Sequence, residues 1–175
     1  MPIPFEEAEA IFRAEKSLIR PFRWESASKS GRNQSCLECR VQIAEALPRG
    51  IFFRAIAYPR FLDTFTFQLE CERLEARAHV TLYRLEVNPL NAHTNKFFGP
   101  DEIQGDFFPV GKTHEHDFHD SLTETGELRS NSCAQARALA DPPSDFATAL
   151  RIVCSRINVV NGTEIPNPPQ QGSLF

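Results

Sequence analysis

Thr81-Leu82-Tyr83-Arg84-Leu85-Glu86-Val87 is the stretch of sequence that decides the fold. Apolar and polar side chains alternate along it, which is the pattern of a β-strand with one buried face. Asn88-Pro89 follows directly, and a proline ends a strand because it cannot donate a hydrogen bond to the next strand. The stretch therefore predicts a half-buried strand whose polar face carries charged side chains.

Further strands are predicted upstream of this one. Residues 36–45, 50–58, 64–70 and 76–87 are short apolar or alternating segments separated by polar turns. A run of Ser, Lys, Gly, Arg and Asn at 26–33 predicts a polar loop before the first of them. Strands that follow one another at such short spacing favour an antiparallel sheet.

A helix is predicted near each end of the chain. Residues 5–20 carry apolar side chains at helical spacing, and Pro21 ends this first helix. Pro142-Pro143-Ser144-Asp145 predicts the start of the second, with Ser144 as its N-cap. The apolar face of the second helix consists of Phe146, Ala149, Leu150, Val153 and Ile157.

The predicted fold is an α+β domain with an antiparallel sheet covered on one face by the N-terminal and C-terminal helices. Residues 91–129 are rich in Gly, Asp, His and Asn, which predicts a long loop with one short strand at 112–118. Residues 1–160 form the single domain. Residues 161–175 form an extended, proline-rich tail.

Composition excludes several classes of protein. A net charge of −4 and a pI near 5.7 over 175 residues argue against sequence-independent DNA binding. No apolar run approaches the roughly 18–20 residues of a membrane span. Residues 1–7 lack the basic start of a secretion signal, so we expect a cytoplasmic protein. Five cysteines in a chain of this size favour reduced thiols.

The last five residues predict a partner. Gln171, Ser173, Leu174 and Phe175, which follow the proline-rich segment 165–170, match the Gln-x-(Ser/Asp)-Leu-Phe peptide of bacterial proteins that dock on the β sliding clamp. Gly172 departs from the pattern, since the best clamp peptides usually carry Leu there, and this departure predicts a weaker peptide. The alternative is that Leu174 and Phe175 fold back onto the core of the chain.

With this terminal motif in a small acidic chain, the sequence resembles the SocB family of toxins from bacterial toxin–antitoxin pairs. The resemblance implies a protein that blocks replication elongation at the clamp. It also implies a cognate antitoxin that acts as a proteolytic adaptor and an ATP-dependent protease as further partners. A clamp-recruited repair accessory protein would carry the same tail, so the motif leaves inhibition and recruitment open.

A second segment inside the chain is similar to the terminal motif. Gln104-Gly105-Asp106-Phe107-Phe108 carries Phe in place of Leu, so Gln104, Phe107 and Phe108 are candidates for an auxiliary clamp contact. Strand or loop residues anchored in the core are the alternative. The paired phenylalanines at 52–53, 97–98 and 107–108 raise the same question, because one member of each pair in a strand points away from the core.

The strongest candidate for the site of an enzyme is the segment His114-Glu115-His116-Asp117-Phe118-His119-Asp120. In a strand, His114 and His116 share one face, and His119 or Asp120 follows in the next turn, so these side chains are candidate ligands for Zn²⁺ or Fe²⁺ in a small metal-dependent enzyme. His-x-His also occurs on polar strands without a metal.

Cys36 and Cys39 have the spacing of half a zinc knuckle, so a mixed site with the histidines is a further alternative, against a structural role for small apolar side chains. Complete catalytic and nucleotide-binding motifs are absent. We therefore expect a binding protein without a cofactor or metal rather than an enzyme.

Overall fold

The computed structural model describes residues 3–29, 32–44, 50–73, 76–129 and 132–169. The strands of the main sheet are β1 (Lys16–Leu18), β2 (Glu25–Lys29), β3 (Arg32–Ile43), β4 (Ile51–Tyr58), β5 (Phe61–Arg73), β6 (Ala76–Val87), β9 (His114–Asp117) and β10 (Arg137–Ala138). The other elements are helix α1 (Phe5–Arg13), helix α2 (Phe146–Arg156), the two-stranded β7 (His93–Thr94) and β8 (Phe107–Phe108), and 3-10 turns at Asp101–Ile103, Phe118–Ser121 and Gly162–Glu164.

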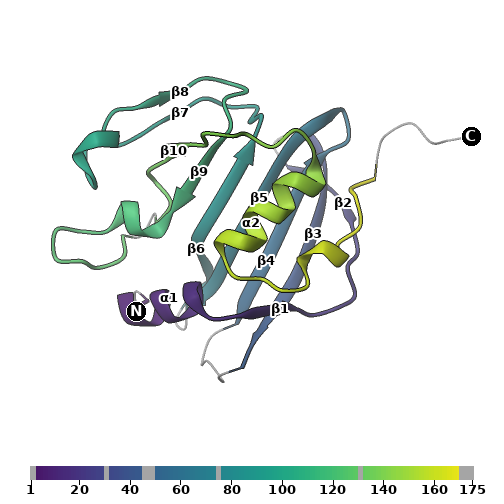
Figure 1. The fold of residues 1–175 in the computed structure, drawn as a ribbon, viewed down its shortest axis with the longest axis horizontal. Helices are drawn as coiled ribbons and strands as arrows, with labels where there is room; N and C mark the ends of the chain where they lie inside the picture. Colours follow the sequence, from purple (N-terminus) through teal and green to yellow (C-terminus); the bar gives the residue numbers. More distant parts are fainter. Residues whose placement is uncertain (1–2, 30–31, 45–49, 74–75, 130–131, 170–175) are drawn as a thin grey trace, which may run out of the picture.

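The main sheet has the strand order β1-β3-β4-β5-β6-β9-β10, with β2 also paired to β3 (Figure 1). Every strand pair in it is antiparallel. The described chain is therefore an α+β fold with an antiparallel sheet, an N-terminal helix and a C-terminal helix, which confirms the predicted class.

The core lies on one face of this sheet. Leu37, Ala55, Phe67 and Leu85 are consecutive cross-strand partners on β3, β4, β5 and β6, and all four are fully buried. Side chains that are opposite one another in neighbouring strands point to the same face. The four strands predicted from apolar alternation are thus present, and their buried residues form one continuous row.

Helix α2 packs on this row through Phe146. Its ring lies 5.3 Å, centroid to centroid, from the rings of Phe65 and Phe67 on β5. The N-cap is Asp145, whose Oδ1 accepts a hydrogen bond of 2.8 Å from the backbone N–H of Thr148. The predicted cap, Ser144, lies one residue too early, because the helix starts at Phe146 and the carboxylate of Asp145 accepts from the N–H of its third residue, Thr148.

Helix α1 is shorter than predicted, since it ends at Arg13 and not before Pro21. The cause is Lys16, a fully buried residue whose Nζ donates to the carbonyl oxygens of Phe12, Ala14 and Ile157 at 2.6–2.8 Å. A charged side chain is rarely buried unless such partners surround it. The chain therefore leaves the helix and continues as β1.

The prediction of a polar loop at 26–33 is wrong for the residues of this range that the structure describes, 26–29 and 32–33. Residues Glu25–Lys29 form β2, which pairs with β3 in a regular antiparallel register from Glu25↔Cys36 to Lys29↔Arg32. Strand pairing uses backbone groups, so a polar composition marks an exposed strand as readily as a loop.

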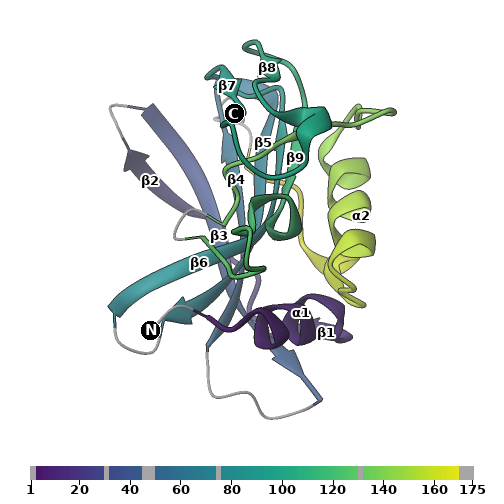
Figure 2. The ribbon, with the colours of Figure 1, turned by 90° about the vertical axis from the view of Figure 1, so that its left-hand side faces the viewer.

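The segment predicted as a long loop, 91–129, contains β7, β8 and β9 together with two 3-10 turns. Its short strand at 112–118 is confirmed in position as β9. Gly99 adopts a positive φ of 77°, and a Cβ there would collide with the carbonyl oxygen of Asp120. The β7–β8 pair lies beside β9 (Figure 2).

Residues 16–24 and 158–166 lie side by side, and we call this pairing the terminal seam. Lys16 exchanges backbone hydrogen bonds with Asn158 and Val160, and the side chain of Asn161 bonds both the N–H and the carbonyl of Leu18. The predicted domain ends at residue 160, whereas the seam contains residues up to Pro166, whose carbonyl accepts from the indole N–H of Trp24 at 3.0 Å.

Candidate functional site

Three possible metal ligands meet on the sheet face opposite the core row. Strands β6 and β9 pair Arg84 with His116 and Glu86 with His114, so the four side chains lie on one face. The ligand atoms of Glu86, His114 and His116 all lie within 4.8 Å of one another. Glu86 Oε2 is 3.1 Å from the Nε2 atom of each histidine. We call these three residues the Glu86 cluster.

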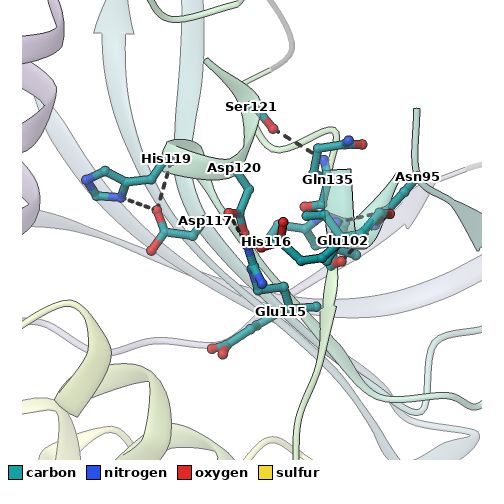
Figure 3. A network of polar contacts seen from close by, with 12 residues as sticks. Asn95, Glu102, Glu115, His116, Asp117, His119, Asp120, Ser121 and Gln135 are labelled. Carbon is teal, nitrogen blue, oxygen red and sulfur yellow. Dashed lines mark hydrogen bonds and ion pairs between the residues drawn. The ribbon is translucent and has the colours of Figure 1, made fainter. Parts of the chain in front are cut away.

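The second nitrogen of each histidine is fixed by a backbone carbonyl. His114 Nδ1 lies 2.8 Å from the oxygen of Lys112, and His116 Nδ1 lies 2.9 Å from the oxygen of Gln135. Ser121 Oγ accepts hydrogen bonds from the backbone N–H groups of Ala134 and Gln135 (Figure 3). Both imidazole rings are therefore held in place from the side away from Glu86.

The β7–β8 hairpin covers the cluster. The ring of His93 lies 5.5 Å from that of His114 and 4.9 Å from that of His116, and the ring of Phe108 lies 4.9 Å from that of His114. Asn95, at the end of β7, anchors the hairpin through hydrogen bonds to backbone groups of Ile103 and Ala136. His114 and His116 are fully buried, while the Glu86 side chain keeps 23% of its surface exposed.

Burial sets the protonation of His116. It lowers the pKa of His116 to about 4, so the ring is neutral at pH 7. Burial acts to raise the pKa of Glu86, but hydrogen bonds from His114 and His116 and the charge of Arg84 hold that pKa far below its usual value. At neutral pH the cluster thus contains a carboxylate beside at least one neutral imidazole.

Arg84 completes the surroundings. Its Nη2 lies 3.2 Å from His116 Nε2 and 3.4 Å from the carbonyl oxygen of Cys133, and its Nε lies 3.6 Å from Glu86 Oε2. Within the part of the chain that the structure describes, Arg84 Nε is buried without a hydrogen-bond partner. The guanidinium supplies positive charge to the carboxylate, but its hydrogen bonding is incomplete.

The structure brings together two of the three histidines considered as metal ligands. His119 lies in the 3-10 turn after β9, where its Nδ1 is 2.5 Å from Asp117 (Figure 3). Its Nε2 is 2.6 Å from Glu9. Although burial opposes this, Asp117 and Glu9 raise the pKa of His119. Asp120 forms a two-pronged ion pair with Arg137. Neither His119 nor Asp120 belongs to the cluster.

The ligand missed from the sequence is Glu86. It stands 28 residues before His114, and only the pairing of β6 with β9 brings the two together. The sequence signal that could have found it is the Arg84-x-Glu86 alternation on the polar face of the most clearly predicted strand.

Cys36 and Cys39 do not form half of a zinc site. Three residues apart on β3, they lie on opposite faces of the strand, and burial raises the pKa of Cys39 to about 12. All five cysteines lie in the described ranges, and no disulfide joins any of them there.

The internal copy of the clamp motif is folded into the hairpin. Phe108 is 5% exposed and covers His114, whereas Phe107 is 64% exposed. Gln104 donates its amide N–H groups to Gly99 and Asp101. Of the other phenylalanine pairs, Phe52-Phe53 is buried and Phe97 is 87% exposed.

The terminal motif lies outside the described residues, which end at Pro169. Ile165 is 5% exposed, and after it Pro166, Asn167 and Pro169 are exposed. Residues 166–169 belong to no helix or strand.

No protein-family model, curated protein or solved structure matches this chain. None of the helices in the described ranges is long and apolar enough to cross a membrane.

Proposed function

We propose that this protein binds the bacterial DNA polymerase III β sliding clamp through its C-terminal peptide. The observation that carries the proposal is the sequence Gln171-x-Ser173-Leu174-Phe175 directly after the proline-rich segment 165–170. Occupancy of the peptide cleft excludes the polymerase and repair factors that need the same cleft. Replication elongation is then blocked by competition, as in the toxins that the sequence resembles.

The attachment of the tail to the body supports this proposal. Ile165 is buried and the carbonyl of Pro166 is held by Trp24, so the chain is firmly anchored up to this point. Pro168 and Pro169, which follow, favour an extended chain because they fix φ and donate no hydrogen bonds. An anchored base followed by a stiff spacer suits a peptide that is presented to a partner.

The expected affinity is modest. Burial of the two apolar side chains Leu174 and Phe175 contributes about 1.5–3 kcal/mol each, and ordering a flexible tail costs about 2–5 kcal/mol. These two terms leave at most about 4 kcal/mol, which corresponds to a Kd of about 1 mM, so hydrogen bonds of Gln171 at the edge of the cleft must contribute if the peptide alone is to bind in the micromolar range. Contacts from the folded body, for which the exposed Phe107 is a candidate, would be needed for tighter binding.

In this proposal the body acts by binding and not by catalysis. The resemblance to the toxin family implies control by an antitoxin adaptor that delivers the protein to an ATP-dependent protease. The alternative role, a repair accessory protein recruited by the clamp, uses the same peptide and differs only in its effect on elongation.

The first test is titration of the purified protein with a bacterial β clamp. The double variant Leu174→Ala/Phe175→Ala should lose most of the affinity while its unfolding transition stays unchanged. A matched control is Phe61→Ala/Leu62→Ala, because Phe61 and Leu62 are an exposed apolar pair, 48% and 60% accessible, in another part of the surface. Equal binding by both double variants would refute the docking role of the tail.

A primer-extension assay with clamp and polymerase separates the two roles. An inhibitor slows elongation at concentrations that saturate the clamp, and the Leu174→Ala/Phe175→Ala variant does not. Unchanged elongation by a protein that binds the clamp would identify a recruited accessory factor.

A further inference from the structure

The Glu86 cluster has fewer protons than its contacts require. Each of its two imidazole rings places both nitrogens against oxygen acceptors: the carbonyls of Lys112 and Gln135 at 2.8 and 2.9 Å, and Glu86 Oε2 at 3.1 Å from both Nε2 atoms. Four hydrogen bonds of this kind need both rings to be doubly protonated. Two adjacent imidazolium ions beside Arg84 would repel one another with little solvent to screen them.

Arg84 and Glu86 require different protonation states of the same atom, His116 Nε2. Its Nη2, which can only donate, lies 3.2 Å from His116 Nε2, so this contact requires a lone pair at Nε2. Glu86, on the other side, requires a proton there. No arrangement of protons satisfies both contacts, which indicates that the geometry of this face is suited to something other than a hydrogen-bond network.

A cation at the centre of the cluster resolves these demands. With Nδ1–H of His114 donating to Lys112 and Nδ1–H of His116 donating to Gln135, both rings are neutral and direct their Nε2 lone pairs toward Glu86 Oε2. A backbone carbonyl that accepts from Nδ1–H is the usual support for a histidine that binds a metal through Nε2. Three acceptors then converge within 4.8 Å of one another.

We propose that Glu86, His114 and His116 form a binding site for a divalent first-row transition metal ion of the Zn²⁺ or Fe²⁺ type. Two imidazoles and one carboxylate favour such ions over Mg²⁺ and Ca²⁺, which prefer oxygen ligands. Three protein ligands leave at least one coordination position open. The site is independent of the clamp-binding tail.

The surroundings suit such an ion. His93 and Phe108 cover the buried histidines, whereas the side chains of Glu86 and Arg84 remain 23% and 27% exposed. Access from solvent is thus on the side of Glu86 and Arg84. The guanidinium of Arg84 supplies the positive charge near Glu86 in the metal-free protein, and a bound ion would supply it instead.

The test uses full-length protein treated with a chelator and then titrated with Zn²⁺ and, as a spectroscopic probe, Co²⁺. The expected result is one ion per chain with a Co²⁺ absorption spectrum of nitrogen and oxygen ligands. His116→Gln should weaken binding by about a hundredfold or more. His79→Gln is the matched control, because His79 also contacts a carboxylate on the sheet, Glu70, at 3.2 Å, but has no second histidine beside it.

Glu86→Gln provides a second variant if His116→Gln does not fold. The amide keeps the shape of Glu86 and can donate to the histidine lone pairs, so the fold should persist while the affinity for metal falls. Circular dichroism checks folding in each case. Absence of stoichiometric binding by the wild-type protein, or full retention of binding by folded Glu86→Gln, would overturn the proposal.

Discussion

Two carboxylates on the sheet, Glu70 on β5 and Glu86 on β6, have different partners. Glu70, 6% exposed, receives Arg54 Nη1 at 3.3 Å and the single nitrogen His79 Nδ1 at 3.2 Å. Glu86 faces two histidine nitrogens, each on a ring whose other nitrogen already faces a carbonyl. Donors suffice around Glu70 and are too few around Glu86. This difference in the balance of donors and acceptors is why the metal site is proposed at Glu86 and not at Glu70.

Acid should have the largest effect on the Glu86 cluster. The pKa of His116 is lowered to about 4 by burial. As the pH falls, His116 is therefore protonated in the unfolded chain at a higher pH than in the folded protein. The free energy of unfolding of the metal-free protein should fall by about 3 kcal/mol from pH 6.5 to pH 4. The low pKa of Glu86 adds a loss of the same sign below pH 4.5.

Urea unfolding at several pH values measures this loss. His116→Gln removes the titrating ring and should flatten the slope of stability between pH 6.5 and pH 4. An identical slope in the variant would place the acid sensitivity elsewhere and would weaken the distinction between the two carboxylates.

Carboxamide substitutions should act unequally at the two carboxylates. Glu70→Gln leaves Arg54 and His79 with a weaker, partly mismatched acceptor, and we expect the free energy of unfolding to fall by about 1–3 kcal/mol. Glu86→Gln removes the charge that Arg84 stabilises, but its amide adds donors where they are lacking, so the free energy of unfolding of the metal-free protein should fall less than in Glu70→Gln. Equal destabilisation by both changes would show that the two clusters are alike.

The smallest effect is expected at the arginines. Arg84→Met removes a competing positive charge from the Glu86 cluster and should raise the affinity for Zn²⁺ by about tenfold, which corresponds to about 1.4 kcal/mol. Arg54→Met is the matched control, since Arg54 serves Glu70 and Glu38. Isothermal titration of both variants measures the difference, and a gain at Arg54→Met as large as that at Arg84→Met would point to a general charge effect.

Local patterns predicted much of the fold. Alternation placed the strands that became β3 to β6, and helical spacing placed α2. The errors came from partners distant in sequence: Lys16 leaves the helix and is buried with the help of a carbonyl that Ile157 supplies 141 residues later. Polar residues 25–29 became β2 because pairing depends on backbone register, which side-chain polarity does not reveal.

Only the part of the candidate site that depends on local spacing could be predicted from the sequence. The spacing of His114 and His116 places both on one strand face, which any strand of this sequence would do. Glu86 joins them only through the register between β6 and β9, and His119 leaves them because the chain turns after Asp117. The clamp-binding tail stays a prediction from sequence, as it lies outside the described residues.

The terminal seam has a consequence for the synthesis of this protein. Residues 16–24 leave the ribosome well before their partners at 158–166 are made. Lys16 needs the carbonyl of Ile157, 141 residues later, and Leu18 needs Asn161, 143 residues later. Since contacts this distant in sequence form late, residues 16–24 should be among the last to become native, and a chain released before Pro166 would expose this segment to quality control.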